Sequence, residues 1–591
     1  MVSKRKKWLM PIATAAVAMT LAGCSSNGGG SDSSSKQAET TNKQFPVSVS
    51  NKSKPVEGGT LSLAMVSDTP FTGIFNSALA TSANDSSVSQ FGDESLFKYD
   101  DNYKIVDGGA ANLKLNVDAK TATITINPNV KWSDGQPLTA KDVVYSYKII
   151  ANPATKSSRY TESLQGIEGI TDYNAGKSDQ ISGITTPNGE DGNEVVIKFK
   201  EMKPGMTQSG NGYLWETASP EHQLKDVPFD KLVSSDQVRK TPLYYGPYKL
   251  SNLVAGQSAE WVPNEYYYGE KPKLSKITIS VVSPSNATQA ALSNTYDIIG
   301  VQNSAWKEVQ SAPNTEFIGK IPLSYSYLGF KVGKWDAEKG ESVMNTNSKM
   351  SDQKLRQAIG YAMNVDQAYE KFMNGLSFRI PTLIPEQFEQ YFNKDVKGYD
   401  FNLDKANQLL DEAGYKKEGD YRVDKNGQPL VIKLAAMSGS AVQEPIIQNY
   451  IQQWKKIGLN VQLTSGRLIE FNSFYDKIQN DDPDVDMFMA AWSLSSEPSP
   501  NDIYNRKAPF NFSRFVSDEQ DKLLADIDSQ DSFNAEHRQK AFFKWQEWMN
   551  DNAYVIPIAN SYGITAVNKR VVGYSKLPSS SWASVGVSEN K

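Results

Sequence analysis

The order of strands and helices between residues 430 and 492 restricts the possible fold more than any other feature of the sequence. Runs rich in Val, Leu and Ile alternate there with segments whose apolar residues recur at helical spacing, such as Ile447, Tyr450 and Trp454. We predict strands at 430–437, 459–464 and 485–492, and helices at 442–457 and 468–479. Since right-handed crossovers join parallel strands, this β-α-β-α-β order predicts an α/β fold.

The loops after the predicted strands are the first candidates for a ligand site. On a parallel sheet, ligands bind in the crevice beyond the carboxyl ends of the strands. That rule points to residues 438–441, 465–467 and 493–500, and the first two could equally be ordinary connectors. The third loop is the strongest candidate because it combines an indole, two hydroxyls and a carboxylate, on Trp492, Ser493, Ser495 and Glu497.

The chain is long enough to form two or three lobes, since 591 residues are about four times a usual domain length. Apolar residues make up 39% and charged residues 22%, so everything except the N-terminal tail can bury a core. The 62 basic and 67 acidic residues give a net charge of −5. This balance indicates no polyanionic partner, and we expect no binding to nucleic acid.

The N-terminus has the features of a bacterial lipoprotein signal. A basic start at 4–7 precedes an apolar run at 8–21, whose 14 residues are fewer than a membrane-spanning helix needs. The run ends in Leu-Ala-Gly-Cys, which resembles a lipobox, and Cys24 is the only cysteine. We predict a signal peptide at 1–23, acyl chains on Cys24 and a flexible tether at 24–56. Together they would hold the protein on the extracellular face of the cell membrane.

A strand, a turn and a helix are predicted in the first half of the chain. β-branched residues at 121–127 favour the strand, and the helix begins at Leu138, where Thr139 and Asp142 can form an acidic capping box. The segment 210–213 (GNGY) is predicted to be a turn. It is not a nucleotide-binding loop, because the third glycine of such a loop is missing.

Residues suited to enzymatic chemistry are scarce. The two histidines, His222 and His537, are far apart in the sequence, and the cysteine is assigned to the lipid. The acidic run at 481–486 resembles the start of a calcium loop, but Pro483 interrupts it and Met487 stands where the turn needs glycine. We expect no cofactor, no metal and no catalysis, with the paired carboxylates of a hydrolase as the open alternative.

Several longer stretches resemble one family. They are VKWSDGQPLTAKDVVYSY from Val130, YYGPYKL from Tyr244, VPNEYYYGEKPKLSKI from Val262, DQKLRQAIGYAMNVDQ from Asp352 and AYVIPI from Ala553. In this order they are similar to the extracytoplasmic solute-binding proteins of the peptide and nickel class (family 5), which serve ABC importers. The resemblance implies a periplasmic-binding-protein-like fold, in which two lobes close over a cleft and a third lobe is added.

The resemblance also implies how the chain is divided. Lobe I is expected to combine residues 57–104, 238–320 and 560–591, with the extra lobe II at 105–237 and lobe III at 321–559. Hinges are expected where the chain crosses between lobes, near 236–241 and near Tyr562. We expect the protein to be a monomer.

For function, the resemblance implies capture of oligopeptides and their delivery to a membrane permease and its ATPases. The cleft would hold an extended peptide by its backbone, while hydrated pockets accept varied side chains. A peptide-pheromone receptor of the same fold is the main alternative. The predicted ligand-binding residues are Gln90, Phe91, Asp93, Glu94, Tyr213, Trp215, Tyr244, Tyr245, Trp492, Ser493, Ser495, Glu497, Asn511 and Phe512.

One position departs from the family pattern. In enterobacterial oligopeptide-binding proteins, the third residue after the tryptophan is an aspartate that pairs with the ammonium group of the peptide. This chain has Ser495 there. Either Glu497 replaces the aspartate, or the peptide N-terminus is not clamped and long peptides can extend beyond the cleft. We favour the second hypothesis.

Overall fold

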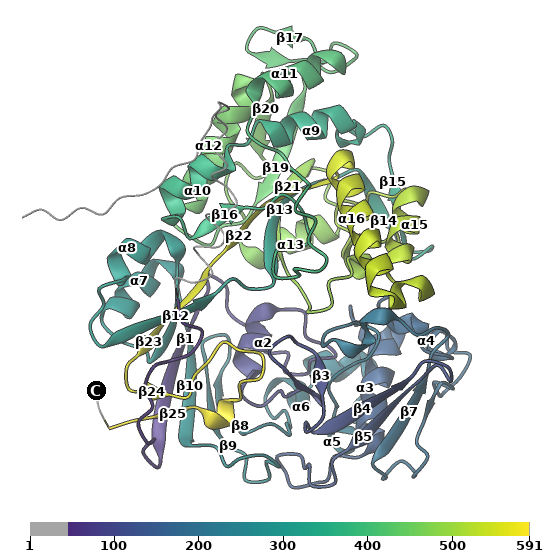
Figure 1. Cartoon of the computed structure of the whole chain (residues 1–591), viewed down its shortest axis with the longest axis vertical. Helices are drawn as coiled ribbons and strands as arrows, with labels where there is room; N and C mark the ends of the chain where they lie inside the picture. The colour runs from purple at the N-terminus through teal and green to yellow at the C-terminus, as the bar shows by residue number, and fades with distance from the viewer. Residues whose placement is uncertain (1–44, 590–591) are drawn as a thin grey trace, which may run out of the picture.

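Three large β-sheets organise the protein, whose computed structural model describes residues 45–589 (Figure 1). A seven-stranded sheet and a four-stranded sheet lie in the lower half of Figure 1, and a six-stranded sheet lies in the upper half. Helices accompany each sheet, which gives the α/β architecture expected from the sequence. The predicted signal peptide and the lipid-bearing Cys24 lie outside the described residues.

The seven-stranded sheet brings together strands from distant parts of the chain. Its order is β12 (Thr315–Lys320), β23 (Gly563–Asn568), β11 (Ile298–Val301), β1 (Gly59–Val66), β10 (Leu274–Val282), β9 (Ser258–Pro263) and β8 (Tyr248–Val254). Strand β1 pairs in parallel with β10 and β11, and its alternate residues Leu61, Leu63 and Met65 are buried. Strand β23, from near the end of the chain, lies between β11 and β12 and is antiparallel to both.

The four-stranded sheet is antiparallel and carries helix α3. Its strands are β4 (Ala111–Asn116), β5 (Thr121–Ile126), β7 (Glu194–Lys198) and β6 (Ile184–Thr185), and α3 spans Ala140–Ala151. The capping box of Thr139 and Asp142 is confirmed, although the helix begins at Ala140 instead of Leu138. Asp142 is buried, accepting hydrogen bonds from the backbone N–H of Thr139 at 2.9 Å and from Trp132 Nε1 at 3.1 Å.

The six-stranded sheet contains the predicted β-α-β-α-β unit. Its order is β16 (Ser377–Arg379), β22 (Val555–Ser561), β13 (Ser324–Phe330), β21 (Met487–Ser493), β19 (Val431–Ala436) and β20 (Asn460–Leu463). Strand β19 is parallel to both β20 and β21, as predicted, and the crossover helices are α12 (Gln443–Lys456) and α13 (Phe471–Gln479). Helix α13 starts later than residue 468, because the Glu470 carboxylate caps it by accepting from the N–H groups of Asn472 and Ser473.

The chain passes directly between the seven-stranded and six-stranded sheets at two places, from β12 to β13 and from β22 to β23. Strand β12 ends at Lys320 and β13 begins at Ser324, while β22 ends at Ser561 and β23 begins at Gly563. In Figure 1 the yellow ribbon of β22 runs down into β23. Tyr562, where a hinge is expected from the sequence, is the single residue between those two strands. Residues 236–239 of the other expected hinge form a short helix, α6 (Asp236–Arg239).

The remaining elements are further helices and two-stranded pairs. The helices are α2 (Ala83–Ser89), α4 (Ile170–Asn174), α5 (Glu221–Leu224), α7 (Pro284–Leu292), α8 (Trp306–Val309), α9 (Gln353–Tyr361), α10 (Val365–Met373), α11 (Leu403–Glu412), α14 (Asn501–Tyr504), α15 (Asp518–Ile527) and α16 (Ala535–Asn552). The two-stranded pairs are β2 (Lys98–Tyr99) with β3 (Ile105–Val106), β14 (Gly333–Asp336) with β15 (Glu341–Met344), β17 (Lys417–Glu418) with β18 (Tyr421–Arg422), and β24 (Val571–Val572) with β25 (Gly586–Val587). None of the helices within residues 45–589 has the length and apolar character needed to cross a bilayer.

Candidate ligand-binding cleft

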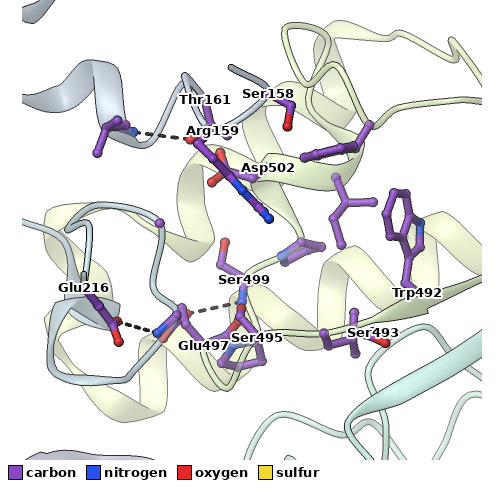
Figure 2. Close-up of a pocket in the computed structure, with 18 of the residues that line it drawn as sticks. Ser158, Arg159, Thr161, Glu216, Trp492, Ser493, Ser495, Glu497, Ser499 and Asp502 are labelled. Carbon is purple, nitrogen blue, oxygen red and sulfur yellow. Dashed lines mark hydrogen bonds between the residues drawn. The ribbon is translucent and has the colours of Figure 1, made fainter. Parts of the chain in front are cut away.

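A cavity of about 450 Å³ lies between segments that belong to different sheets (Figure 2). One wall consists of residues 158–164 and 210–217, which connect the elements around the four-stranded sheet. The other wall consists of residues 383–388 and 492–503 from the part of the chain that builds the six-stranded sheet. Apolar side chains alternate with hydroxyl groups on both walls, as is typical of a site for an amphipathic ligand.

Strand β21 ends in this cavity with one edge free. Strand β13 pairs with β21 up to Ser493, but β19 pairs with it only as far as Met489. The N–H of Leu494 donates to the Leu323 carbonyl on the β13 side, at 2.8 Å. Because backbone groups alternate in direction along a strand, those of Ala491 and Ser493 face the other side, where the Ala491 carbonyl accepts from the Tyr475 hydroxyl at 3.1 Å. The end of β21 therefore presents the backbone N–H and carbonyl of Ser493, which lines the cavity, without a strand partner on that side.

An aromatic cluster supports the end of β21. The ring of Trp492 is nearly parallel to Tyr327, with centroids 6.5 Å apart, and to Phe512, with centroids 5.3 Å apart. Phe510 meets the same indole edge-on at 5.5 Å. Trp492 keeps partial exposure and lines the cavity, while Tyr327 and Phe512 are buried behind it. The indole is thus held in a fixed position, with part of its surface left for a ligand.

The two walls contact each other directly. Ser209 and Ser496 share a hydrogen bond of 2.7 Å between their hydroxyl groups, and the hydroxyl of Ser163 donates to Asp502 at 2.8 Å. On the side of the seven-stranded sheet, the hydroxyl of Ser438 donates to Asp68 at 3.0 Å. Residues 205–212 and 495–502 therefore meet across the cleft.

Glycines allow this close approach. A Cβ atom at Gly210 would lie 3.0 Å from the Cβ of Ser495, and one at Gly212 would lie 2.8 Å from a carboxylate oxygen of Asp502. A Cβ atom at Gly205 would collide with the carboxylate of Glu497. Side chains at these positions would hold the walls apart.

Glu497 already has a buried partner. Its carboxylate forms an ion pair with Arg538, which also contacts Asp528 at 3.3 Å, and all three side chains are buried. Burial raises the pKa of Glu497, although the positive charge of Arg538 opposes that effect. A carboxylate held in this way has no free charge for the ammonium group of a ligand.

Two other acids of the cavity have strongly raised pKa values. Burial raises the pKa of Asp502 to about 6, against the hydrogen bond from Ser163. Burial likewise raises the pKa of Glu216 to about 7, against hydrogen bonds from the Tyr99 hydroxyl and from the Gly210 N–H. Both carboxyl groups therefore titrate between acidic and neutral pH.

The structure brings together five of the predicted ligand-binding residues. They line the cavity from both walls and are Trp215, Trp492, Ser493, Ser495 and Glu497. Phe512 and Asn511 lie behind this surface, where the Asn511 amide donates to the Phe515 carbonyl at 2.9 Å. These two residues support the cavity and do not line it.

The other predicted residues lie elsewhere. Tyr213 and Tyr245 are buried in the core around the four-stranded sheet, and Tyr244 is buried in the core of the seven-stranded sheet. Residues of the 90–94 segment, namely Gln90, Phe91, Asp93 and Glu94, line a second cavity of about 500 Å³ together with residues 578–584. Burial raises the pKa of both Asp93 and Glu94 to about 7.

Sequence reasoning missed part of the cavity. Arg159 and Asp502 carry charge there, and the aliphatic surface comes partly from Leu383, Ile384 and Phe388. Asp502 lies two residues beyond the predicted 493–500 loop, and the others follow no strand of the predicted parallel unit, so the rule that pointed to that loop could not find them. In the described part of the chain, no group of three or more His, Cys, Asp or Glu side chains could hold a metal ion.

The fold and the cleft define a solute-binding protein. The family model of bacterial extracellular solute-binding proteins, family 5 (middle), matches residues 79–513, and the chain belongs to this family. The protein is thus a solute-binding protein and not an enzyme, in keeping with relatives that are named as binding proteins.

Individual relatives cover nearly the whole chain. The oligopeptide-binding protein OppA of Lactococcus lactis subsp. cremoris is 44% identical over 100% of this chain and 99% of its own length. AppA of Bacillus subtilis, also named as an oligopeptide-binding protein, is 26% identical over 89% of this chain and 88% of its own length.

Solved structures confirm the periplasmic-binding-protein-like fold. Lactococcal OppA, complexed with an endogenous peptide in the closed conformation, has a TM-score of 0.87 and 45% sequence identity. The match covers 90% of this chain and 100% of that one. AppA of Bacillus subtilis in complex with a nonapeptide has a TM-score of 0.74 at 22% identity and covers 91% of this chain and 100% of its own, which supports the fold alone.

Proposed function

We propose that the protein is the substrate-binding component of an ABC importer and captures oligopeptides in the cleft, mainly through their backbone. The observation that carries the proposal is the free edge of β21 at the cavity. A peptide backbone that leaves water must keep hydrogen-bond partners or lose about 1 to 3 kcal/mol for each orphaned group. Strand addition supplies those partners whatever the side chains are.

The walls of the cavity suit variable side chains. Hydroxyl groups of Ser158, Thr161 and Ser499 lie among apolar residues on both walls. Water molecules between such hydroxyls and a ligand can satisfy polar side chains at little cost. The names of the relatives, which are oligopeptide-binding proteins, support this class of ligand.

The N-terminus of the peptide is not clamped by charge in this proposal. Ser495 carries no charge, and its hydroxyl donates to the Glu497 carbonyl at 2.8 Å. The Glu497 carboxylate is paired with the buried Arg538. A peptide could therefore extend beyond the cavity at its N-terminal end.

Each large sheet would mark one lobe. Lobe I would contain the seven-stranded sheet, lobe II the four-stranded sheet and lobe III the six-stranded sheet, with the boundaries expected from the sequence. The two sheet-to-sheet connections at 321–323 and at Tyr562 would then act as hinges. The proposal also includes a monomer, held outside the cell membrane by lipid on Cys24, that delivers peptides to a permease and its ATPases.

The test uses the mature chain without its lipid, residues 25–591, and the probe peptide hexaalanine. Calorimetry should show saturable binding. Methylation of single backbone nitrogens of the probe should weaken binding by about tenfold or more wherever that N–H pairs with β21. Replacing single alanines by Ser, Leu or Lys should change the affinity by less than that.

Three outcomes would contradict the proposal. If every N-methylated probe bound as tightly as unmethylated hexaalanine, the backbone-directed mechanism would be wrong. Tight binding of one peptide from a mixed library, with no binding of hexaalanine, would favour a signal receptor. Cleavage products in the mass spectrum would favour a hydrolase.

Acetylation of the probe peptide tests the unclamped N-terminus separately. Removing the ammonium charge should cost well under 2 kcal/mol, whereas breaking a buried charge pair costs about 2 to 5 kcal/mol. A loss in the larger range would assign an ammonium anchor to the cleft.

A further inference from the structure

Arg159 is the only lysine or arginine among the residues that line the cavity. Its Nη2 donates to the Ala80 carbonyl at 3.0 Å, while Nε is enclosed and has no partner among residues 45–589. Arg159 forms no ion pair with any acid in this described part of the chain. Figure 2 shows the side chain extending from its wall toward the 493–502 loop. The cavity therefore contains one cation that the protein itself does not neutralise.

Trp215 supplies a second unpaired donor on the same wall. Its indole Nε1 is also enclosed and has no partner among the residues described. The guanidinium carbon of Arg159 lies 5.9 Å from the centre of the Trp215 ring. The guanidinium thus packs near this indole, and each of the two side chains keeps one enclosed N–H group without a partner, which costs free energy.

The acids of the cavity are committed to other groups. Glu497 pairs with Arg538, Asp502 accepts from Ser163, and Glu216 accepts from Tyr99 and Gly210. Burial alone lowers the pKa of Arg159, with no acid acting against it. An unpaired charge that is partly removed from water is costly, so a negative ligand group at this position would be favoured.

We infer that Arg159, with Trp215 beside it, forms a subsite for a carboxylate of the bound peptide. The inference rests on the proposed function and adds a charge preference to it. A planar guanidinium matches a carboxylate with parallel N–H···O bonds, and the Trp215 ring packs against the guanidinium. The carboxylate belongs either to the peptide C-terminus or to an Asp or Glu side chain, since both offer the same chemistry.

Binding of matched probes to the unaltered protein tests the inference first. Hexaalanine is compared as free acid and as C-terminal amide. Each alanine of the amidated peptide is then replaced in turn by Glu and by Gln, and the affinities of the two are compared. A free acid that binds about thirtyfold or more tightly than the amide assigns the subsite to the C-terminus. A similar advantage of Glu over Gln at one position assigns it to a side chain.

Equal affinities in both comparisons would overturn the inference and leave the proposed function intact, because hexaalanine amide would still bind. Failure of every probe to bind would instead reject the proposed function, together with the inference that rests on it. The two failures are therefore distinguishable from ligand chemistry alone, without any variant.

Variants then assign the preference to Arg159. Arg159→Gln should abolish the advantage of the carboxylate, measured as the ratio of the variant's own affinities for hexaalanine free acid and hexaalanine amide, and a cooperative melting transition shows that the variant is folded. Arg159→Lys should keep part of the advantage. Lys156→Gln is the matched control, because it removes one positive charge from an exposed residue of the same segment and should keep the full advantage. An undiminished preference in a folded Arg159→Gln variant would overturn the inference.

Discussion

Gly205 shows how a single residue sets the distance between the walls of the cleft. It lies in a short turn at Pro204–Thr207 and faces the carboxylate of Glu497. That carboxylate cannot move aside freely, because its ion pair with Arg538 is buried. There is therefore room for the hydrogen atom of glycine at this position but not for a methyl group.

We predict that Gly205→Ala weakens peptide binding by about tenfold or more, since interactions from both walls require closure and a clash between packed groups costs about 1 to 3 kcal/mol. Calorimetry with hexaalanine measures the effect, and X-ray scattering should show a more open molecule. Gly166→Ala is the control, because a Cβ atom there meets nothing within 4 Å. Equal affinities of the two variants would refute the prediction.

Asp142 is a residue whose role concerns stability. Its carboxylate accepts from the Thr139 N–H, the Trp132 indole and the Glu221 N–H, at 2.9, 3.1 and 2.9 Å. We predict that Asp142→Ala lowers the free energy of unfolding by roughly 3 kcal/mol, because it removes a helix cap and leaves buried donors unpaired. Urea denaturation measures the loss. Asp118→Ala, at an exposed turn, should cost less than about 0.5 kcal/mol.

Residue types alone could identify only part of the candidate site. Tyr213, Tyr244 and Tyr245 carry the same aromatic groups as Trp492, yet they are buried in cores. An aromatic side chain provides apolar surface for either purpose, and the choice depends on which segments meet in space. Arg159 gave no signal because it follows a polar stretch without periodicity, and its importance comes from what surrounds it.

At the scale of secondary structure, the sequence pattern predicted those strands, helices and caps that a short stretch of residues determines. The strands and helices between residues 430 and 492 and the Thr139 cap were expected, because their periodicity and capping residues lie within short windows. The antiparallel strands β13 and β22 occupy the middle of the same sheet but were not predicted. Several of their residues pair with residues more than 150 positions away in the sequence, such as Ser324 with Ser493 and Ser326 with Ala559, so no short window contains both partners.

The free edge of β21 gives a prediction about register. Ser493→Pro removes an N–H that faces the cavity, so it should weaken binding of hexaalanine by about tenfold while changing the melting temperature little. Leu494→Pro removes the N–H that donates to Leu323, so it should lower the melting temperature. Ser493→Ala controls for the lost hydroxyl. If Leu494→Pro and Ser493→Pro had the same effect on stability, the alternation of backbone groups assigned to this strand would be wrong.

At the scale of the whole molecule, buried acids make stability depend on pH. The pKa is raised to about 6 for Asp502 and to about 7 for Glu216, Asp93 and Glu94. The folded protein therefore holds protons that the unfolded chain releases near pH 4. The stabilisation from these protons is complete below about pH 4 and is lost as the pH rises to about 7.

We predict that the melting temperature is higher by a few degrees at pH 5.5 than at pH 8. Asp502→Asn should reduce this difference, because the amide mimics the protonated acid at both pH values. The nearby acids Asp528 and Glu162 also favour protonation of Asp502. Asp118→Asn, at an exposed turn, should leave the difference unchanged. Calorimetric scans at the two pH values measure it, and a melting temperature that rose with pH would contradict the sign.

The position of β23 has a consequence for biogenesis. This strand comes from the last thirty residues of the chain, yet it is an interior member of its sheet and the only partner of β12 there. While a ribosome or a translocation channel still encloses the C-terminus, β12 lacks its neighbour and the sheet stays incomplete. Final assembly of this sheet must therefore wait until the last part of the polypeptide is free, after the four-stranded sheet is already complete.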